Sequence, residues 1–254
     1  MRKRIAAVIL TLCMAVLACT CLAGCSKDSS KPAYQLVEEG TLTVALSPDF
    51  PPFDTKEGDA CSGIDVDVVR EIATRLGLGL KVVAVPFDEV VQGVGDGAYD
   101  VAVSGLSINP SRSEIVDFSS PYYLVDQAIV AKKGSYEKVS ELKGKRVAAQ
   151  AGTTGYDYAK ANVSDSVVGY DSVSECFDAL EAGEVAGVVA DEPSCAYFMR
   201  NGCSNCSTLE TAATCEKYAV AVNKNNRGLT DAINEVLDQM DKDGTLAAIQ
   251  KQAE

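Results

Sequence analysis

Short apolar runs alternate with amphipathic stretches from residue 42 to the end of the chain. A short apolar run predicts a buried strand, and apolar residues spaced three or four apart predict a helix. Strands that alternate with helices are typical of a largely parallel sheet covered by helices, so the pattern predicts an α/β fold. The predicted strands are 42–46, 80–85, 101–103, 146–149, 185–189 and 218–222, and the predicted helices are 64–76, 89–94, 173–182, 229–242 and 246–252.

Residues that favour helix ends occur at several of the predicted boundaries. Gly77 and Gly183 directly follow two predicted helices, where glycine commonly ends a helix in a left-handed conformation. We expect Asp88 to cap the helix that follows it. Asn109 and Pro110 are expected to begin a further helix after the third strand, with Asn109 as the cap and Pro110 in the first helical position.

The first residues have the features of an export signal. Three bases at positions 2–4 precede an uncharged apolar run over 5–22, and small residues follow. This order is typical of a secretory signal peptide, which we place at residues 1–24. The alternative is an uncleaved anchor helix, because the apolar run is almost long enough to span a membrane.

The end of this signal, Leu22-Ala23-Gly24-Cys25, resembles the lipobox of bacterial lipoproteins. The resemblance implies that Cys25 becomes the acylated first residue of the mature chain and carries a palmitate-type membrane anchor. Residues 25–36 would then be the lipidated cysteine and a flexible polar tether.

Charge and composition exclude several classes of function. The chain has 23 Lys and Arg residues against 36 Asp and Glu residues, a formal net charge of −13, and loss of the signal's three bases leaves −16. Such a charge disfavours nucleic-acid binding through a basic field. Histidine is absent, which excludes Ser-His-Asp and Cys-His catalysis and the commonest metal ligand. Carboxylate and lysine chemistry stay open, and no cofactor or metal is expected.

Six of the ten cysteines lie in the body of the chain, and an even number in an exported protein allows disulfides. Four of them are close in sequence and can pair in three ways. The spacing of Cys203 and Cys206 also allows a four-cysteine zinc site, but we favour disulfides because the chain is exported. The four candidates are Cys195, Cys203, Cys206 and Cys215.

Three predicted strand ends carry polar residues, at the edge where open α/β sheets bind ligands. The segment 104–107 contains small hydroxyl and glycine residues and precedes Arg112, whose guanidinium can clamp a carboxylate. The segment 150–155 is a second loop of small residues, and Asp191 follows the strand 185–189. An arginine for a carboxylate and an acid for a cation suit a zwitterion such as an α-amino acid.

A series of short motifs resembles the polar amino-acid family of extracellular solute-binding proteins, which are the capture subunits of ABC importers. The motifs cover nearly the whole mature chain and include Pro51-Pro52-Phe53, Gly63-Ile64-Asp65-Val66-Asp67, the segment 104–112, Gly152-Thr153-Thr154, Ala190-Asp191-Glu192 and Asp243-Gly244-Thr245. The resemblance implies a two-lobed, periplasmic-binding-protein-like fold of type II with two hinge strands and a ligand cleft between the lobes. Lobe 1 would comprise 37–125 and 219–254, and lobe 2 would comprise 126–218.

The resemblance also implies roles for individual residues. Arg112 would pair with the ligand carboxylate, helped by backbone N–H groups near Ser107 and Thr154. Asp191 would accept the α-ammonium beside the Ser107 hydroxyl and the Gly105 carbonyl. Gly155 would lie at the side-chain end of the pocket. The ligand-binding residues expected in this way are Phe50, Phe87, Ser104, Gly105, Ser107, Arg112, Gln150, Thr153, Thr154 and Asp191, although Phe87 is as well suited to the core of lobe 1 and Thr153 to a helix cap.

The function implied is that of an extracytoplasmic, monomeric lipoprotein, anchored through Cys25, that captures a polar L-α-amino acid and delivers it to an ABC permease without catalysis. Ser47 stands where members that bind lysine or arginine carry an acid, which favours a neutral polar ligand such as glutamine or cystine; Asp49 or Glu89 can substitute for that acid. The alternatives are an exported dehydratase of cyclic acids such as prephenate or arogenate, a ligand-sensing subunit, and a binding protein for another carboxylate such as an opine.

Overall fold

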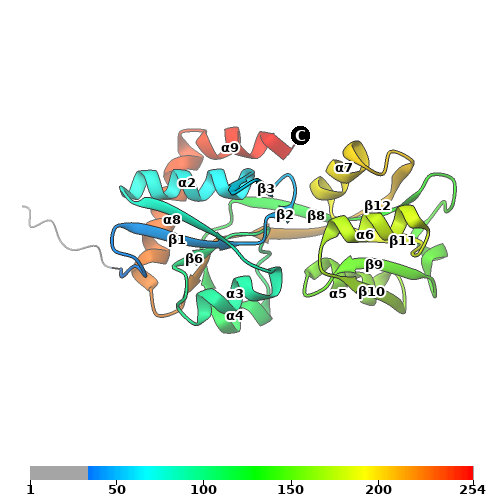
Figure 1. Cartoon of the computed structure of the whole chain (residues 1–254), viewed down its shortest axis with the longest axis horizontal. Helices are drawn as coiled ribbons and strands as arrows, with labels where there is room; N and C mark the ends of the chain where they lie inside the picture. Colours follow the sequence, from blue (N-terminus) through cyan, green and yellow to red (C-terminus); the bar gives the residue numbers. More distant parts are fainter. Residues whose placement is uncertain (1–33, 254) are drawn as a thin grey trace, which may run out of the picture. The chain divides into compact units, whose positions relative to one another are not determined.

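Residues 34–253 are described by the computed structural model (Figure 1). The predicted signal peptide and Cys25 lie outside the described residues. Across residues 34–253, no helix combines the length and apolar character needed to cross a membrane. The described part contains two five-stranded sheets and one small three-stranded sheet.

The first five-stranded sheet defines lobe 1. Its strands lie in the order β5 (Gly79–Ala84), β1 (Thr41–Leu46), β6 (Val101–Ala102), β13 (Ala221–Asn223) and β7 (Val116–Phe118). β1 pairs in parallel with β5 and β6, whereas β13 pairs antiparallel with β6 and β7. Because β13 comes from the C-terminal part of the chain, two separate stretches of sequence build this lobe.

Helices cover both faces of the first sheet because side chains along β1 alternate between two apolar layers. The helices concerned are α2 (Ile64–Leu76), α3 (Phe87–Gly95), α4 (Pro110–Ile115), α8 (Arg227–Lys242) and α9 (Thr245–Gln250). Val44 and Leu46 belong to the core that contains α2 and α8, and Ala45 belongs to a second core with Val90 and Val94 of α3. Burial of one such aliphatic side chain stabilises the fold by about 1.5–3 kcal/mol.

The second five-stranded sheet defines lobe 2. Its strands lie in the order β10 (Ser166–Tyr170), β9 (Arg146–Gln150), β11 (Gly187–Asp191), β8 (Tyr123–Lys132) and β12 (Cys206–Tyr218). β9 pairs in parallel with β10 and β11, and β8 pairs antiparallel with β11 and β12. A short 3-10 helix, η1 (Val139–Leu142), precedes β9.

Helices also cover both faces of the second sheet. They are α5 (Thr154–Asn162), α6 (Val173–Ala182) and α7 (Glu192–Asn201). Val147 and Val189 pack with Ala159 of α5 on one face. Ala148 and Val188, their neighbours along the same strands, belong to the core that contains residues of α6 and α7. The two-lobed α/β fold that the sequence predicts is therefore the observed one.

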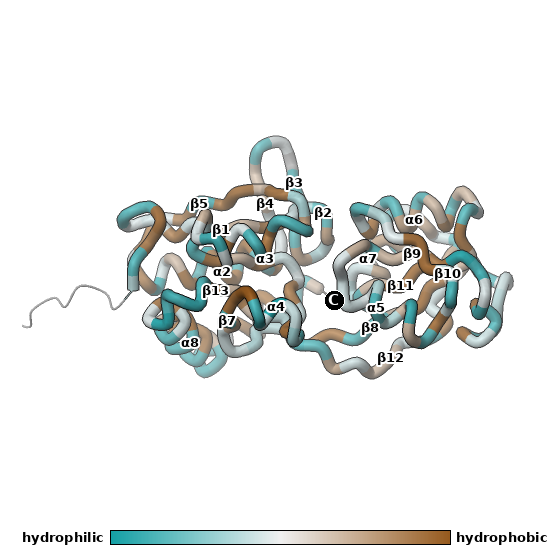
Figure 2. The backbone as a smooth tube through the Cα atoms, turned by 90° about the horizontal axis from the view of Figure 1, so that it is seen from below, coloured by the Kyte–Doolittle hydropathy of each residue, from teal (hydrophilic) through white to brown (hydrophobic). Residues whose placement is uncertain are grey.

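The two segments that link the lobes pair with each other. β8 and β12 run side by side over almost their whole length (Figure 2), with Tyr123 opposite Tyr218 and Leu124 opposite Lys217 at the lobe 1 end. Beyond this end, Ser107 of lobe 1 forms an isolated bridge with Tyr218. The chain thus passes between the two sheets along β8 and β12.

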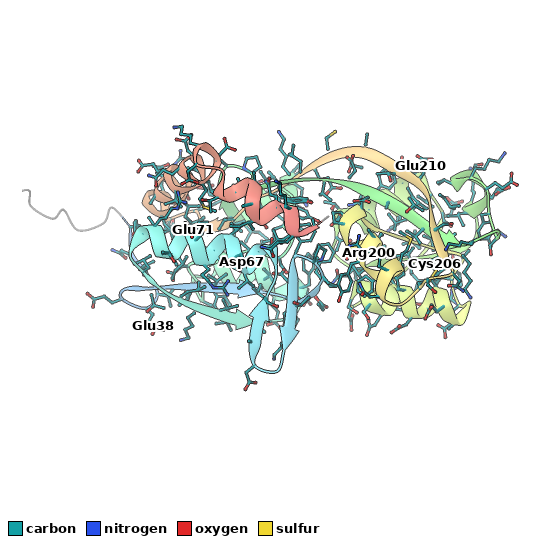
Figure 3. The ribbon with its side chains drawn as sticks, turned by 90° about the horizontal axis from the view of Figure 1, so that it is seen from above. Glu38, Asp67, Glu71, Arg200, Cys206 and Glu210 are labelled. Carbon is teal, nitrogen blue, oxygen red and sulfur yellow. A yellow bond between two sulfur atoms is a disulfide. The ribbon has the colours of Figure 1, made fainter. Side chains whose placement is uncertain are left out.

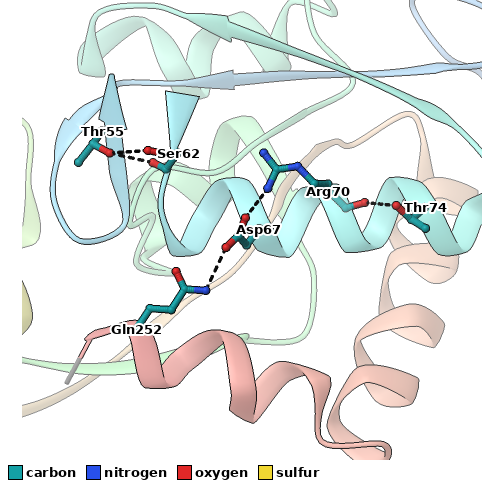
Figure 4. A network of polar contacts seen from close by, with 6 residues as sticks. All are labelled: Thr55, Ser62, Asp67, Arg70, Thr74 and Gln252. Carbon is teal, nitrogen blue, oxygen red and sulfur yellow. Dashed lines mark hydrogen bonds and ion pairs between the residues drawn. The ribbon is translucent and has the colours of Figure 1, made fainter. Parts of the chain in front are cut away.

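The C-terminal turn is held to lobe 1 by polar contacts (Figure 4). Gln252, in the 3-10 helix η2 (Lys251–Ala253), donates a hydrogen bond to Asp67 of α2 over 3.0 Å. Asp67 also pairs with Arg70 one turn further along the helix. The small third sheet lies between β1 and α2 in the chain and consists of β2 (Asp49–Phe50), β3 (Asp54–Glu57) and β4 (Ala60–Ser62).

Several predicted helix ends are confirmed, and one is wrong. α2 and α6 have the predicted bounds, and Gly77 and Gly183 follow them in left-handed conformations with φ of 70° and 76°. Asn109 caps α4 by accepting a hydrogen bond from the backbone of Arg112. The predicted cap at Asp88 is wrong, because Pro86 holds the extended conformation that starts α3 at Phe87, two residues earlier, and leaves Asp88 in the first turn.

Other elements escape the sequence pattern. β10, β12 and α7 were not expected, and the strand predicted at 185–189 lies at 187–191. β12 is an edge strand in which buried residues are few and polar ones frequent, so it lacks an apolar run. α7 begins with Pro193 in its first turn and has no sustained apolar spacing, so its burial depends on contacts with β8, β11 and α6.

The four candidate disulfide cysteines divide into one pair and two free thiols. Cys203 and Cys206 form a disulfide between the end of α7 and the start of β12 (Figure 3). Cys195 is free and buried, with its thiol facing the carbonyl of Ala190 at 3.5 Å, and Cys215 is free and exposed. The expectation that Cys195 and Cys215 take part in disulfides is therefore wrong, because Cys195 lies inside lobe 2 and Cys215 lies on its surface.

Candidate functional site

The loop after β6 carries the first group of predicted site residues. The hydroxyl of Ser104 accepts a hydrogen bond from the backbone N–H of Ser47 over 3.0 Å, and the N–H of Gly105 donates to Asp65 over 2.7 Å. Gly105 has φ of 55°, and an added Cβ would lie 2.6 Å from the ring of Phe50. Glycine is therefore required here, because it adopts this conformation and lets the loop approach the aromatic ring.

Arg112 is the buried base of this loop. Asn109 caps the short helix α4 and so places Arg112 in its first turn, with 8% of its surface exposed. Its guanidinium donates to the carbonyl of Ser107 over 3.0 Å and to the carbonyl of Gly152, in lobe 2, over 3.4 Å. Burial lowers the pKa of Arg112, while the neighbouring Asp191 favours its charged form. Within the described residues, Arg112 forms no direct ion pair.

The start of α5 carries the second group. Thr153 caps this helix by accepting from the N–H of Tyr156 over 3.1 Å, and its own hydroxyl donates to the carbonyl of Gln150. The side chain of Gln150 in turn donates to the carbonyl of Asp171 over 2.8 Å. The cap role considered for Thr153 is thus confirmed. On either side of this cap, the carbonyl of Gly152 accepts from Arg112 of lobe 1 and the hydroxyl of Thr154 donates to Glu216.

Asp191 ends β11 and is the acid of the site. Its carboxylate accepts hydrogen bonds from Gln127 of β8 and from the hydroxyl of Tyr218, the latter over 2.5 Å. Burial raises the pKa of Asp191 to about 7, and the nearby Glu216 acts in the same direction, whereas the bonds from Tyr218 and Gln127 oppose it. Asp191 is therefore placed to accept a cation such as an ammonium group, and binding of that cation would favour the ionised carboxylate.

These groups surround one pocket with about 390 Å³ of empty space, part of it open to solvent. The pocket is lined by Phe50, Phe87, Ser104, Gly105, Arg112, Gln127, Gln150, Thr153, Thr154, Gly155, Val173, Val189, Ala190 and Asp191.

Both predicted aromatic residues lie in the pocket wall. Phe50 is buried and stacks on Phe53 with ring centres 5.6 Å apart. Phe87 is half-buried, packs with the α3 core, and has the guanidinium of Arg112 5.5 Å from its ring centre. Phe87 therefore combines the core contact and the pocket contact that the sequence left as alternatives.

The pocket brings together every predicted ligand-binding residue except Ser107. Ser107 is buried next to the pocket, but its hydroxyl donates to Glu216 over 2.6 Å. The backbone carbonyl of Ser107 still holds Arg112. While it donates to Glu216, the Ser107 hydroxyl can still accept a hydrogen bond, so the expected contact with an ammonium group stays a prediction.

Sequence reasoning missed three polar residues around Asp191: Gln127, Glu216 and Tyr218. Gln127 is wholly buried in β8, where the apolar run conceals its role. Glu216 and Tyr218 end β12, which was not predicted. The signal that could have found them is spacing on an extended strand, since Glu216 and Tyr218 are two residues apart and share one face.

The geometry suits reversible binding of a zwitterion. Arg112 and Asp191 are the charged residues of the described lining, one from each lobe, and the rest of the lining is neutral.

Among residues 34–253, no group of three or more cysteine or acidic side chains is placed to hold a metal ion.

Comparisons with known proteins agree with this geometry. Residues 42–253 match the family model described as bacterial extracellular solute-binding proteins, family 3. The chain is 28% identical over 244 residues to the L-cystine-binding protein TcyJ of Escherichia coli (strain K12), covering 93% of this chain and 92% of that protein.

Two solved structures extend the comparison. An ancestral arginine-binding protein bound to arginine has a TM-score of 0.77 and 35% identity, covering 84% of this chain and 97% of the other. The ancestral amino acid-binding protein AncCDT-1, described as a precursor of cyclohexadienyl dehydratase, has a TM-score of 0.77 and 28% identity, covering 84% and 95%.

Proposed function

We propose, from the premise that this chain belongs to family 3 of the bacterial extracellular solute-binding proteins, that it captures a polar L-α-amino acid outside the cytoplasm and passes it to an ABC permease. Capture is physical and changes no bond in the amino acid. The relatives named for cystine and arginine binding support an amino acid as the ligand class.

The observation that carries this proposal is the convergence of Arg112 and Asp191 on one pocket from opposite lobes. A ligand α-carboxylate would pair with Arg112 and with N–H groups at the start of α5. Its α-ammonium would pair with Asp191. Each buried charge then gains a partner only when the lobes are closed on a zwitterion, which favours an α-amino acid over a simple anion or amine.

The neutral lining supports a neutral polar side chain, such as that of glutamine or cystine. Once Arg112 and Asp191 hold the ligand backbone, the remaining polar lining residues are amides and hydroxyls: Gln127, Gln150, Ser104, Thr153 and Thr154. These groups can donate and accept hydrogen bonds without requiring a charge on the ligand.

A basic amino acid is the competing ligand, because a second hollow adjoins the pocket at Phe87 and is acidic. Its lining includes Asp49, Asp88, Glu89 and Asp171. A long cationic side chain that passed Phe87 would reach these carboxylates. Arginine and lysine therefore belong in the same ligand screen as glutamine and cystine.

We place the protein at the outer face of the membrane through lipidation of Cys25, with residues 25–36 as the tether and the monomer as the working form. Lobe 1 would comprise 37–125 and 219–254, and lobe 2 would comprise 126–218. The pairing of β8 with β12 supports hinges near residues 124 and 218.

A thermal-shift and calorimetry screen of residues 26–254 against the amino acids and cystine tests the proposal. At one hundred times its dissociation constant, a bound amino acid stabilises the protein by about 2.7 kcal/mol. We expect Arg112→Ala and Asp191→Ala to remove this shift, and Arg227→Ala, a change at an exposed pair in α8, to retain it. Equal shifts in all three variants would contradict the assigned pocket.

The second candidate function is a dehydratase acting on a cyclic acid in the same pocket. The raised pKa of Asp191, about 7, is suited to proton transfer. One similar structure, an ancestral amino acid-binding protein, is described as a precursor of cyclohexadienyl dehydratase. Turnover of prephenate or arogenate, lost in Asp191→Asn, together with no shift from any amino acid, would replace capture by catalysis.

A further inference from the structure

Glu216 lies beside the pocket without lining it, and its carboxylate accepts three hydrogen bonds. Its carboxylate accepts from the hydroxyl of Ser107 over 2.6 Å and from the hydroxyl of Thr154 over 2.6 Å. The amide nitrogen of Gln127 donates to it over 2.9 Å. A carboxylate that accepts bonds from several donors forms stronger contacts than a neutral group would.

The three donors come from different parts of the molecule. Ser107 belongs to the loop that holds Arg112 in lobe 1, and Thr154 is the first residue of α5 in lobe 2. Gln127 lies on β8, the strand that links the lobes. Glu216 therefore connects the two loops on which the ligand carboxylate is expected to bind, and it does so at the crossing between the lobes.

An irregularity in β12 places Glu216 at this point. After an earlier shift between Thr208 and Glu210, pairing with β8 runs to Ala212 opposite Gln127. It resumes with Glu216 opposite Val125, so three residues of β12 bulge out between them. Within the bulge, Cys215 has φ of 51° and its N–H donates to Asp126 over 2.8 Å. Bulges of this kind redirect a side chain, and here the side chain is Glu216.

The amide of Gln127 links Glu216 to Asp191. Its nitrogen donates to both carboxylates, and the opposite orientation of the amide would set its oxygen against two acids. Its oxygen has no hydrogen-bond partner among the described residues and faces Gly155, where an added Cβ would lie 2.8 Å away. Gln127 therefore holds both Asp191, which is proposed to receive the ammonium, and Glu216, which lies between the two loops.

We propose that Glu216 is a positioning residue that ties the Ser107 loop of lobe 1 to α5 of lobe 2 and so holds the binding pocket assembled. The carboxylate acts on the ligand through Ser107, Thr154 and Gln127 without contacting it. Loss of Glu216 separates the loops, opens the ligand-free protein and shortens the lifetime of the complex. The effect on ligand affinity rests on the proposed function, whereas the effect on lobe closure does not.

The closure test needs no ligand. Small-angle X-ray scattering of residues 26–254 compares the wild type with Glu216→Ala, Glu216→Gln and Thr154→Val, which keeps the backbone N–H of Thr154. We expect a larger radius of gyration in Glu216→Ala and Thr154→Val, and a smaller change in Glu216→Gln, which retains one acceptor oxygen. Glu210→Gln is the matched control, because Glu210 is an exposed acid on the same strand (Figure 3).

The affinity test uses L-glutamine, L-cystine and L-arginine in parallel. Calorimetry and stopped-flow binding should show about tenfold weaker binding in Glu216→Ala, with the dissociation rate raised and the association rate little changed. The double variant Glu216→Ala with Thr154→Val should lose no more than the worse single variant, because both remove the same contact. Melting of each variant checks that it is folded.

Two results would overturn the inference. One is an unchanged radius of gyration in both Glu216→Ala and Thr154→Val when both variants are folded. The other is strictly additive losses of affinity in the double variant. A wild type that binds none of the three amino acids and closes as described would instead count against the proposed function alone.

Discussion

Asp54 and Asp65 place two carboxyl groups beneath the loop that carries Gly105. Both are wholly buried; Asp65 accepts from the N–H of Gly105 and from the hydroxyl of Tyr122, each over 2.7 Å. Asp54 has no hydrogen-bond partner for either oxygen among the described residues. Burial and the charge of Asp65 raise the pKa of Asp54 well above its usual value, and burial raises that of Asp65 to about 6. Burial therefore favours a proton on this pair of carboxyl groups.

This pair predicts that Asp54→Asn stabilises the protein more at pH 8 than at pH 5. Because folding raises the pKa of Asp54, its contribution to stability is fully present below the unfolded-state pKa of about 3.9 and is lost as the pH rises through the folded-state value. Asparagine does not ionise, so the variant escapes this loss. Urea unfolding should show a difference of about 1–3 kcal/mol between the two pH values.

Asp59→Asn is the control for this measurement, because Asp59 is exposed in the turn between β3 and β4. It should change stability equally at pH 5 and pH 8. The same pH-independent result in Asp54→Asn would show that Asp54 is ionised in the folded protein.

Asp191 predicts that ligand affinity depends on pH. Without ligand its pKa is raised by burial to about 7, in contact with Tyr218 and Gln127 and near Glu216 and Arg112. A bound α-ammonium favours the ionised acid, so binding below pH 7 releases a proton. The dissociation constant should rise as the pH falls from 8 to 5, approaching about tenfold per unit at the acidic end.

Calorimetry in two buffers of different ionisation enthalpy measures the released proton directly. The weaker binding of Asp191→Asn should vary much less with pH. An affinity for the amino acid that is constant from pH 5 to pH 8 in the wild type would mean that Asp191 does not receive the ammonium.

At the scale of the element, the start of α2 requires glycine at position 63. Gly63 precedes the helix with φ of 122°, and an added Cβ would overlap the carbonyl of Phe53. The backbone of residues 52 and 53 also accepts hydrogen bonds from the first N–H groups of α2. The helix and the loop that carries Phe50 are therefore packed backbone against backbone.

This contact predicts that Gly63→Ala lowers the free energy of unfolding by about 3 kcal/mol or more. Gly58→Ala is the matched variant, because Gly58 also has a positive φ, 62°, but an added Cβ meets no atom within 4 Å. It should cost only about 1 kcal/mol, from backbone strain alone. Equal unfolding midpoints of the two variants in urea would show that the overlap at Gly63 is relieved by movement of the loop.

At the scale of the whole molecule, residues from two lobes form the pocket, and the strands of one lobe are inserted in sequence between those of the other. Lobe 1 takes strands from both ends of the described chain, and lobe 2 lies between them in sequence. The acid and the base of the pocket therefore reach each other only when both lobes have folded and β8 has paired with β12. This arrangement makes the lobes' relative position, and not either lobe alone, the determinant of ligand binding.

Local interactions allowed much of the fold to be predicted. The bounds of α2 and α6 follow from apolar spacing and from glycines that end them, and the start of α4 follows from Asn109 and Pro110. The edge strand β12 and the helix α7 could not be predicted, because their stability comes from pairing and packing with distant segments rather than from their own pattern.

The sequence by itself determined the α/β class, the family and the principal charges of the pocket, Arg112 and Asp191, because strand ends and short motifs carry that information locally. Only the tertiary structure decided what surrounds those charges. Gln127 and Glu216 are 89 residues apart and meet through a bulge in β12, and Ser107 turns from the pocket to Glu216. Such contacts depend on strand register and on the packing of one lobe against the other, which no single stretch of sequence specifies.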